Sequence, residues 1–363
     1  MATGFTAFFP MRRLSLLTLL LVACSHSVKP SMPAPVAPVV PVPAVPLLVP
    51  SAALAGSDPT PNSEREAAFV VQAARSSGMS PLEVRAWLDQ ARYQQSIINA
   101  ITRPAEGKPW KDYRPIFLTD ARIQQGRTFY AEHRGELDKV AADTGVPVEI
   151  ILAIIGVETS YGRITGTYRV LDALYTLGFF YPRREEFFRG ELEQLFALAR
   201  EEKLDLATLK GSYAGAMGWG QFMPSSYRAF GRDGDGDGRR DLLGSPRDAF
   251  ASVANYFVGH GWQHGQPAFV PARADPGAAP FVPETFEAKY SLAELAARGY
   301  HPLDAAAPNL PATLLTLEGA NGPEYWIGYQ NFYVITRYNR SPMYAMAVHQ
   351  LAREIAASPS NAP

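Results

Sequence analysis

An apolar run that ends on a carboxylate is the feature that most restricts the fold of this chain. Residues 150–157 are Ile-Ile-Leu-Ala-Ile-Ile-Gly-Val, and Glu158 follows directly. Such a run has no polar face, so it belongs in the interior of a helical core. Burial of an ionised carboxylate is costly unless the group is paired. Glu158 therefore needs a partner, a raised pKa or a chemical role.

Helical periodicity surrounds this run. Ser80-Pro81-Leu82-Glu83 is typical of a helix start, with a capping Ser, Pro at the first helical position and Glu at the third. Asp143 to Pro147 are expected to cap the apolar helix. No internal repeat is visible, and a bundle of helices is expected at the centre of the fold. The sequence predicts helices over 64–77, 81–90, 115–143, 187–200, 249–257 and 342–356.

The pattern changes after His264. Residues 266–335 contain Pro-rich breaks and three short runs with strand character, at 312–318, 324–329 and 331–335. The first two are separated by Gly-Ala-Asn-Gly-Pro, which is a turn sequence. We therefore predict a mainly α (α+β) fold, in which a small antiparallel β domain is inserted into a helical core.

The N-terminal segment has the properties of an export signal. Arg12 and Arg13 precede a short apolar stretch that ends in Leu-Val-Ala-Cys, and Cys24 is the only cysteine of the chain. This arrangement resembles a bacterial lipobox, in which Cys24 becomes the lipidated first residue; the alternative is an ordinary signal peptide with a chance Cys. Ser25 resembles the outer-membrane sorting default. We expect a lipid anchor in the outer membrane, on its periplasmic face.

A tether follows the predicted anchor. Residues 29–61 are dominated by Pro, Ala and Val, and such a segment prefers extended polyproline II at roughly 3 Å per residue. The predicted organisation begins with a signal peptide over 1–23, a tether over 24–61 and a helical domain over 62–145. A helical core with an acidic loop follows over 146–265, then a small β domain over 266–335, and the C-terminal part of the core with a tail over 336–363.

Composition excludes some functions. The 363 residues include 34 Lys and Arg against 35 Asp and Glu, which gives a net charge of −1, so no bulk charge draws the chain to nucleic acid. With one Cys, no internal disulfide can form, and an exported domain must be held by packing or by a metal.

Two stretches strengthen a chemical role for Glu158. Burial and the helix dipole would both raise its pKa, as a general acid near neutral pH requires; the alternative is a Glu paired with Arg163. Residues 211–226 are rich in Gly and Ala, with Ser, Gln, Tyr and Trp interspersed, which is typical of a sugar-binding surface. Residues 337–341 add a polar and aromatic cluster.

These pieces together resemble a known family. VETSYG, GSYAGAMGWGQFMPSSY, SVANYF followed by GW, and NFYVITRYNRS followed by YAMAV occur in order between about residues 62 and 356. They resemble the lytic murein transglycosylases of the membrane-bound type B family. The resemblance implies a lysozyme-like helical core with an additional helical domain and a small β domain. It also implies cleavage of the β-1,4 bond between N-acetylmuramic acid and N-acetylglucosamine in peptidoglycan glycan strands, with a 1,6-anhydromuramoyl product.

The resemblance assigns roles to matching positions. Glu158 corresponds to the only catalytic carboxylate of the family, which acts first as general acid and then as general base. Ordinary glycosidases use two carboxylates. Asp172, Glu185 and Glu186 are candidates for a second one by sequence proximity only, and we expect all three to be solvated charges on helix surfaces. The residues that match the glycan groove of the family are Ser212, Gln221, Tyr256, Tyr338, Asn339 and Tyr344.

The segment 233–241 has the spacing of a calcium loop. Asp233, Asp235 and Asp237 occupy positions 1, 3 and 5 of an EF-hand pattern, and Arg239 would offer its carbonyl at position 7. Gly244 replaces the usual Glu at position 12, and we expect Asp248 to close the site, since the matching loop of the family is also longer. The alternative is an acidic turn without metal. A structural Ca²⁺ is therefore predicted, with no organic cofactor.

Other interpretations remain open at the level of sequence. His260 and His264 could face one another across a helical turn, but no third ligand accompanies them, so we expect surface residues. A hydrolytic muramidase with an unidentified second carboxylate is one alternative function. A non-catalytic peptidoglycan-binding lipoprotein is another, although Glu158 argues against it. Cell-wall synthesis or remodelling proteins are possible partners, and no nucleic acid is expected.

Overall fold

The structure, a computed structural model, describes residues 63–103, 107–304 and 307–357. The predicted signal peptide over 1–23, Cys24 and the predicted tether up to residue 61 lie outside the described residues.

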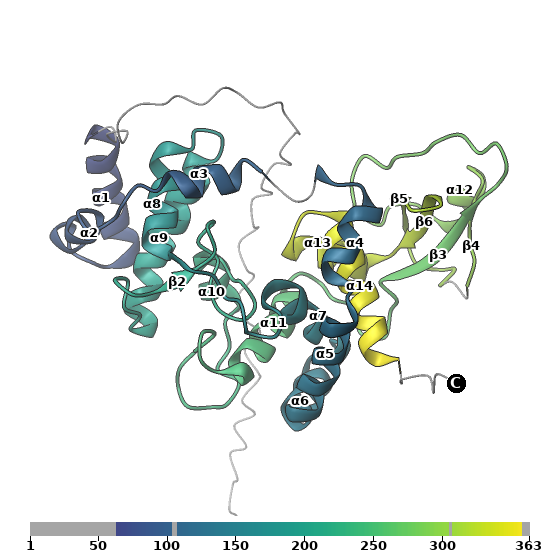
Figure 1. The fold of residues 1–363 in the computed structure, drawn as a ribbon, viewed down its shortest axis with the longest axis horizontal. Helices are drawn as coiled ribbons and strands as arrows, with labels where there is room; N and C mark the ends of the chain where they lie inside the picture. The colour runs from purple at the N-terminus through teal and green to yellow at the C-terminus, as the bar shows by residue number, and fades with distance from the viewer. Residues whose placement is uncertain (1–62, 104–106, 305–306, 358–363) are drawn as a thin grey trace, which may run out of the picture. The chain divides into compact units, whose positions relative to one another are not determined.

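The first described helices pack on a central helical pair. α1 (Ser63–Ser77) lies against α9 (Glu185–Glu202), and α9 packs along α8 (Val170–Phe180) (Figure 1). α2 (Pro81–Leu88) has the predicted capping box, in which the Ser80 side chain accepts from the Glu83 amide. α3 (Gln95–Ile101) contacts α8.

The predicted helix over 115–143 is divided into shorter helices. They are α4 (Trp110–Phe117), α5 (Asp120–Glu132) and α6 (Arg134–Thr144). The Thr119 side chain caps α5, and this local hydrogen bond favours a helix start within the periodic stretch. α6 ends at Gly145, which has a φ of 69° and so turns the chain into the next helix.

α7 (Val148–Thr159) is the apolar helix predicted from the sequence, and it lies in the main core. Its residues from Ile150 to Gly156 are all buried. α14 (Pro342–Ala356) packs along it, after an N-cap at Ser341 and Pro at the first helical position. α10 (Pro224–Phe230) and α11 (Pro246–Gly259) complete this part of the bundle.

The small β domain is present as predicted. β3 (Phe269–Ala274), β4 (Tyr300–Pro302), β5 (Thr313–Gly319) and β6 (Gly322–Gly328) form an antiparallel sheet in the order β4-β3-β6-β5. This domain has its own core, which includes Leu295 of the short helix α12 (Leu292–Ala296). A second antiparallel pair, β1 (Tyr168–Arg169) with β2 (Lys210–Gly211), lies within the helical part.

The third predicted strand is wrong. Residues 331–335 belong to a helix, α13 (Gln330–Tyr338). Phe332, Val334 and Ile335 are buried, and this spacing satisfies a helix face as well as an alternating strand. The buried Asn331 side chain donates to the carbonyls of Gln263 and Gln266, both at 2.8 Å, and fixes the start of the helix.

Among the described residues, no single helix is long and apolar enough to span a membrane. Taken together, the consecutive helices α6 and α7 have the length and composition of a membrane span, but their axes are bent by 115° relative to each other.

Candidate active site

Glu158 lies in the last turn of α7, where the buried run gives way to partial exposure. It is half-buried, and so less enclosed than the sequence predicted. The Tyr344 hydroxyl donates to its Oε1 at 2.6 Å. Burial and the nearby charge of Glu158 raise the pKa of Tyr344 well above 10, so this tyrosine remains a protonated donor. This hydrogen bond gives the carboxyl group a defined orientation.

Tyr344 is placed by the start of α14. The Ser341 hydroxyl caps this helix by accepting from the Tyr344 amide at 3.2 Å. Because α14 packs along α7, the third residue of α14 comes beside the last turn of α7. A residue 186 positions away thus completes the surroundings of the carboxylate.

The chain leaves α7 through a constrained turn. Ser160, Tyr161 and Gly162 have φ values of 50°, 60° and 80°, and left-handed non-glycine residues are strained by about 1 kcal/mol or more each. The Tyr161 hydroxyl donates to the Arg122 carbonyl at 2.9 Å, and the Arg122 guanidinium donates to the Ser160 hydroxyl at 3.2 Å. These contacts maintain the turn, and sequence reasoning missed Arg122 because no motif marks it.

The Gly-rich segment after β2 lies next to this turn. Gln221 has a φ of 49°, and its side-chain amide donates to the carbonyls of Thr165 and Gly218, both at 3.0 Å. The Ser212 hydroxyl accepts from the amides of Ala214 and Ala216 at 3.3 and 3.1 Å. Both residues, predicted to line a glycan groove, thus also shape the backbone of the segment.

An aromatic cluster borders the same segment. The rings of Tyr256 and Tyr338 lie 4.8 Å apart, and the Tyr338 hydroxyl donates to the Gly220 carbonyl at 2.6 Å. Burial raises the pKa of Tyr338, and the charge of Glu158 raises it further. Tyr338 therefore lies near enough to Glu158 to respond to its charge. Asn339 directly follows as the C-cap of α13.

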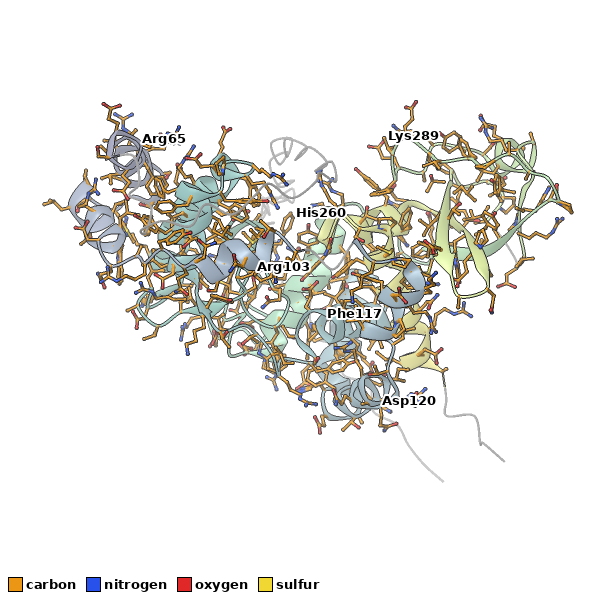
Figure 2. The ribbon with its side chains drawn as sticks, turned by 45° about the horizontal axis from the view of Figure 1, so that its top comes forward. Arg65, Arg103, Phe117, Asp120, His260 and Lys289 are labelled. Carbon is orange, nitrogen blue, oxygen red and sulfur yellow. The ribbon has the colours of Figure 1, made fainter. Side chains whose placement is uncertain are left out.

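His260 also belongs to this cluster, contrary to the prediction of a surface residue. Its ring stacks on Tyr256 at 4.1 Å and lies 4.9 Å from Phe230. Burial lowers its pKa, which favours the neutral imidazole. Figure 2 labels it among the side chains. His264 is exposed, as predicted.

The candidates for a second carboxylate are engaged elsewhere. Asp172 was predicted to be solvated but is buried, in an ion pair with Arg169. It also accepts from the Arg92 amide at 2.9 Å, a contact over 80 positions that local sequence cannot reveal. Glu185, also predicted to be solvated, is mostly buried and pairs with Arg65 and Arg189. Glu186 is exposed, as expected.

The acidic loop brings three carboxylates together. Ligand oxygens of Asp233, Asp235 and Asp248 all lie within 4.8 Å of one another, although the third comes from α11. The Asp237 carboxylate lies outside this group and accepts from the Arg239 amide at 2.8 Å. Several clustered carboxylate oxygens are the ligands that Ca²⁺ prefers. The donor set therefore fits a hard divalent cation.

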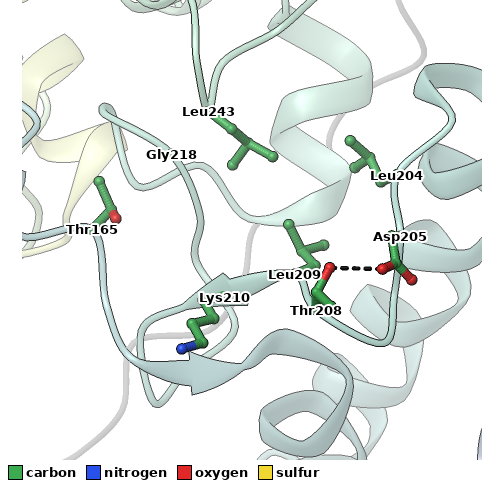
Figure 3. Close-up of a pocket in the computed structure, with 8 residues that line it drawn as sticks. All are labelled: Thr165, Leu204, Asp205, Thr208, Leu209, Lys210, Gly218 and Leu243. Atoms are coloured by element: carbon green, nitrogen blue, oxygen red, sulfur yellow. Dashed lines mark hydrogen bonds between the residues drawn. The ribbon is translucent and has the colours of Figure 1, made fainter.

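A pocket of about 300 Å³ adjoins the Gly-rich segment (Figure 3). It meets the site through Thr165 and Gly218, whose carbonyls bind the Gln221 side chain. Leucine side chains and the Asp205–Thr208 hydrogen-bonded pair form the opposite side. The lining residues are Thr165, Leu204, Asp205, Thr208, Leu209, Lys210, Gly218 and Leu243, so this pocket flanks the site and does not contain Glu158.

Comparisons with known proteins identify the family of this chain. A helical core that ends an apolar helix on one oriented carboxylate, with aromatic and Gly-rich segments beside it, fits an enzyme that cleaves glycans by general acid catalysis. The model of the transglycosylase SLT domain family matches residues 62–353. Membrane-bound lytic murein transglycosylase B of Escherichia coli (strain K12) is 43% identical over 306 residues, which are 82% of this chain and 83% of that protein. The chain belongs to the membrane-bound lytic murein transglycosylase B family and is a lytic transglycosylase.

Two solved structures are similar throughout the described fold. The Escherichia coli lytic transglycosylase Slt35 in complex with calcium is 44% identical, with a TM-score of 0.73 over 80% of this chain and 91% of that one. SltB3 from Pseudomonas aeruginosa in complex with NAG-anhNAM-pentapeptide is 32% identical, with a TM-score of 0.69 over 80% of this chain and 78% of that one.

Proposed function

We propose that this chain cleaves the β-1,4 bond between N-acetylmuramic acid and N-acetylglucosamine in peptidoglycan and forms a 1,6-anhydromuramoyl end. The observation that carries the proposal is the oriented carboxylate: Glu158 ends the buried helix α7 with Oε1 held by the Tyr344 hydroxyl. Family membership supports the substrate class.

The reaction needs one carboxyl group in two successive roles. Protonated Glu158 donates its proton to the glycosidic oxygen as the bond to the anomeric carbon breaks. The carboxylate that remains takes the proton of the muramic acid 6-hydroxyl, as that oxygen bonds to the anomeric carbon. The proton balance of Glu158 is restored and no water is consumed. The Tyr344 hydroxyl, which donates to Oε1, orients the carboxyl group for both proton transfers.

Hydrolysis by an ordinary glycosidase mechanism would need a second carboxylate, either as a base for water or as a nucleophile on the other face of the sugar. The nearest candidates in sequence, Asp172 and Glu185, are committed to arginine ion pairs. This favours the intramolecular attack of the 6-hydroxyl over the attack of water.

The test is Glu158→Gln, which preserves shape and removes the transferable proton. We expect cleavage to fall by several orders of magnitude while glycan binding persists. Glu186→Gln makes the same change at an exposed glutamate and should leave the rate unchanged. Mass spectrometry of the digest identifies the products: anhydro ends support the proposal, whereas reducing ends indicate a muramidase. More than a tenth of the wild-type rate in Glu158→Gln would refute the role of Glu158.

We further propose that the glycan strand lies along the Gly-rich segment and the aromatic cluster. A relative, SltB3, is described in complex with a NAG-anhNAM-pentapeptide, which supports a saccharide ligand of this kind. The contacts of Tyr338 with Gly220 and of Gln221 with Gly218 give the segment a fixed conformation. The residues proposed to contact glycan are Ser212, Gln221, Tyr256, Tyr338, Asn339 and Tyr344.

A structural Ca²⁺ is proposed at the acidic loop. Asp233, Asp235 and Asp248 would supply the clustered oxygens, and Asp237 and the Arg239 carbonyl would complete the set. The ion would neutralise the mutual repulsion of these carboxylates. The calcium complex of the relative Slt35 supports this choice of metal.

Anchoring through a lipidated Cys24 to the outer membrane is the proposed location. The lipobox-like sequence supports it, as does the similarity to a relative named as membrane-bound. Cys24→Ala should release the protein to the soluble periplasmic fraction, because no other acylation site remains. Continued membrane association of this variant would contradict the proposal.

A further inference from the structure

We propose that Thr159 is a positioning residue that holds the catalytic end of α7 against the Gly-rich segment. The inference rests on the proposed role of Glu158, its direct neighbour in the chain. Thr159 lies within the VETSYG motif, but the sequence assigns no role to its side chain.

The contacts of Thr159 join two parts of the site. Its hydroxyl lies 2.8 Å from the Trp219 carbonyl, to which it donates, and 3.1 Å from the Ile155 carbonyl within the same helix. The hydroxyl oxygen also accepts from the Gly162 amide at 2.9 Å. A hydroxyl has one proton, and the shorter distance favours Trp219, 60 positions away. One side chain therefore ties the helix end, the strained turn and the Gly-rich segment together.

Two consecutive residues of the Gly-rich segment, Trp219 and Gly220, have carbonyls that accept hydrogen bonds from two different helices. Thr159 of α7 binds the Trp219 carbonyl, and Tyr338 of α13 binds the Gly220 carbonyl at 2.6 Å. The Trp219 ring lies so close to Gly162 that an added Cβ would meet it at 2.7 Å. The segment is thus fixed in position relative to Glu158 along this line of contacts.

The hydroxyl cannot be replaced by water without rearrangement. Thr159 is 1% exposed, so loss of its oxygen leaves the Gly162 amide and the Trp219 carbonyl, both in half-buried residues, without this partner. Helix α7 could then shift against the segment. A displacement of about 1 Å between an acid and its reacting bond can cost on the order of 10²-fold in rate. The effect should therefore appear in turnover before it appears in binding.

The decisive variant is Thr159→Val, which keeps the shape and removes the hydroxyl, compared with Thr159→Ser, which retains it. Thr176→Val is the matched control: Thr176 is a fully buried threonine on α8 whose hydroxyl accepts from the Gln94 amide at 3.1 Å. Both valine variants should lower the melting temperature. We expect only Thr159→Val to lower kcat, by roughly 10- to 100-fold, with Thr159→Ser within threefold of wild type.

A measurement of glycan binding distinguishes the loss of positioning from a general disruption of the site. Measured in the inactive Glu158→Gln background, glycan affinity should change less than threefold when Thr159→Val is added. A folded Thr159→Val with kcat within threefold of wild type overturns the proposal, as does an equal loss of kcat in Thr176→Val. If Thr159→Val does not fold, Thr159→Cys is used in its place, because a thiol has a similar size to a hydroxyl but is a weak hydrogen-bond donor. A kcat of Thr159→Cys equal to that of Thr159→Ser then overturns the proposal.

The same set distinguishes the two proposals. Activity retained in Glu158→Gln would refute the proposed function itself. Loss of activity in Glu158→Gln together with normal turnover in Thr159→Val would refute only the positioning role.

Discussion

At the scale of single residues, His349 on α14 shows how the core restricts ionisation. Its ring lies 4.8 Å from Phe269 and 6.1 Å from Trp326, and within the described residues its buried Nε2 atom has no hydrogen-bond partner. Burial lowers the pKa of His349 to about 4, and the nearby Arg353 contributes. The neutral form is therefore the one that the fold accommodates.

This lowered pKa predicts a loss of stability in acid. As pH falls below the ordinary histidine pKa of 6.5, the unfolded chain takes up the proton before the folded one, so unfolding becomes easier down to about pH 4. The full effect is about 3 kcal/mol. His349→Leu should remove this component, whereas His264→Leu, at an exposed histidine, should not. Urea unfolding at pH 7, 5.5 and 4.5 measures it; the same pH dependence in wild type and His349→Leu would refute the assignment.

Some site residues could be predicted from the sequence and others could not. The carboxylate at the end of an apolar run was a local signal that marked Glu158, and the Gly-rich stretch and the family resemblance then gave it the catalytic role. The hydrogen bond that Tyr344 donates to it depends on the packing of α14 along α7, so only the family resemblance pointed to this residue. Thr159 lies in the VETSYG motif, but no role was predicted for it, since its main partner is a backbone carbonyl distant in the sequence.

At the scale of elements, α5 and α7 meet around the ring of Tyr161. An added Cβ at Gly126 of α5 would lie 2.5 Å from the Tyr161 hydroxyl oxygen, and one at Gly156 of α7 would lie 2.7 Å from it. The ring cannot withdraw easily, because its hydroxyl binds the Arg122 carbonyl and its backbone φ is 60°. Glycine is therefore required in both helices for close packing.

Gly156→Ala should for this reason destabilise the protein, by roughly 1–3 kcal/mol as an overpacking substitution. Gly190→Ala is the control within a helix: Gly190 is exposed on α9, and a Cβ there meets nothing within 4 Å. It should instead stabilise by up to about 1 kcal/mol, since Ala favours the helix. Thermal melts of the two variants should shift in opposite directions, and a stabilised Gly156→Ala would contradict this account of the helix contact.

The elements predicted best were those with long, regular patterns. α14 has the predicted limits, because Ser341 and Pro342 give it a clear start and its apolar face extends over four turns. Residues 331–335 were predicted as a strand, because a run of only five residues can satisfy both the helical and the strand periodicity. The hydrogen bonds of the Asn331 side chain to the segment after α11 favour the helix. Tertiary contacts of this kind are not visible in a short pattern.

At the scale of the whole described fold, the β domain is joined to the helical core through α4. The Trp110 indole donates to Glu324 at 3.2 Å, and Lys111 pairs with Glu318 at 2.9 Å, both on the β5–β6 hairpin. The exposed ion pair adds little stability, so the buried Trp110 is the more important contact. The chain then returns to the core through α13 and α14, which supply Tyr338 and Tyr344.

The acidic loop is joined to the catalytic region by backbone contacts. The Trp219 amide donates to the Leu242 carbonyl at 3.1 Å, and its indole donates to the Leu243 carbonyl at the same distance. Both leucines lie between Asp233 and Asp248 in sequence. A cation that orders this loop would therefore also support Trp219, whose carbonyl binds Thr159.

Calcium removal should accordingly lower the melting temperature of the whole protein. Without a cation, Asp233, Asp235 and Asp248 repel one another, whereas a ligand present at 100 times its Kd stabilises the folded state by about 2.7 kcal/mol. For a domain of this size that corresponds to a shift of several degrees. Magnesium should stabilise less, because it resists dehydration.

Asp235→Asn should reduce the calcium effect, while Asp304→Asn, at an exposed aspartate elsewhere, should not. Cleavage well below the melting temperature should survive chelation, since the cation takes no part in proton transfer. Melting curves that coincide in excess chelator and in millimolar calcium would exclude a stabilising calcium site in this loop.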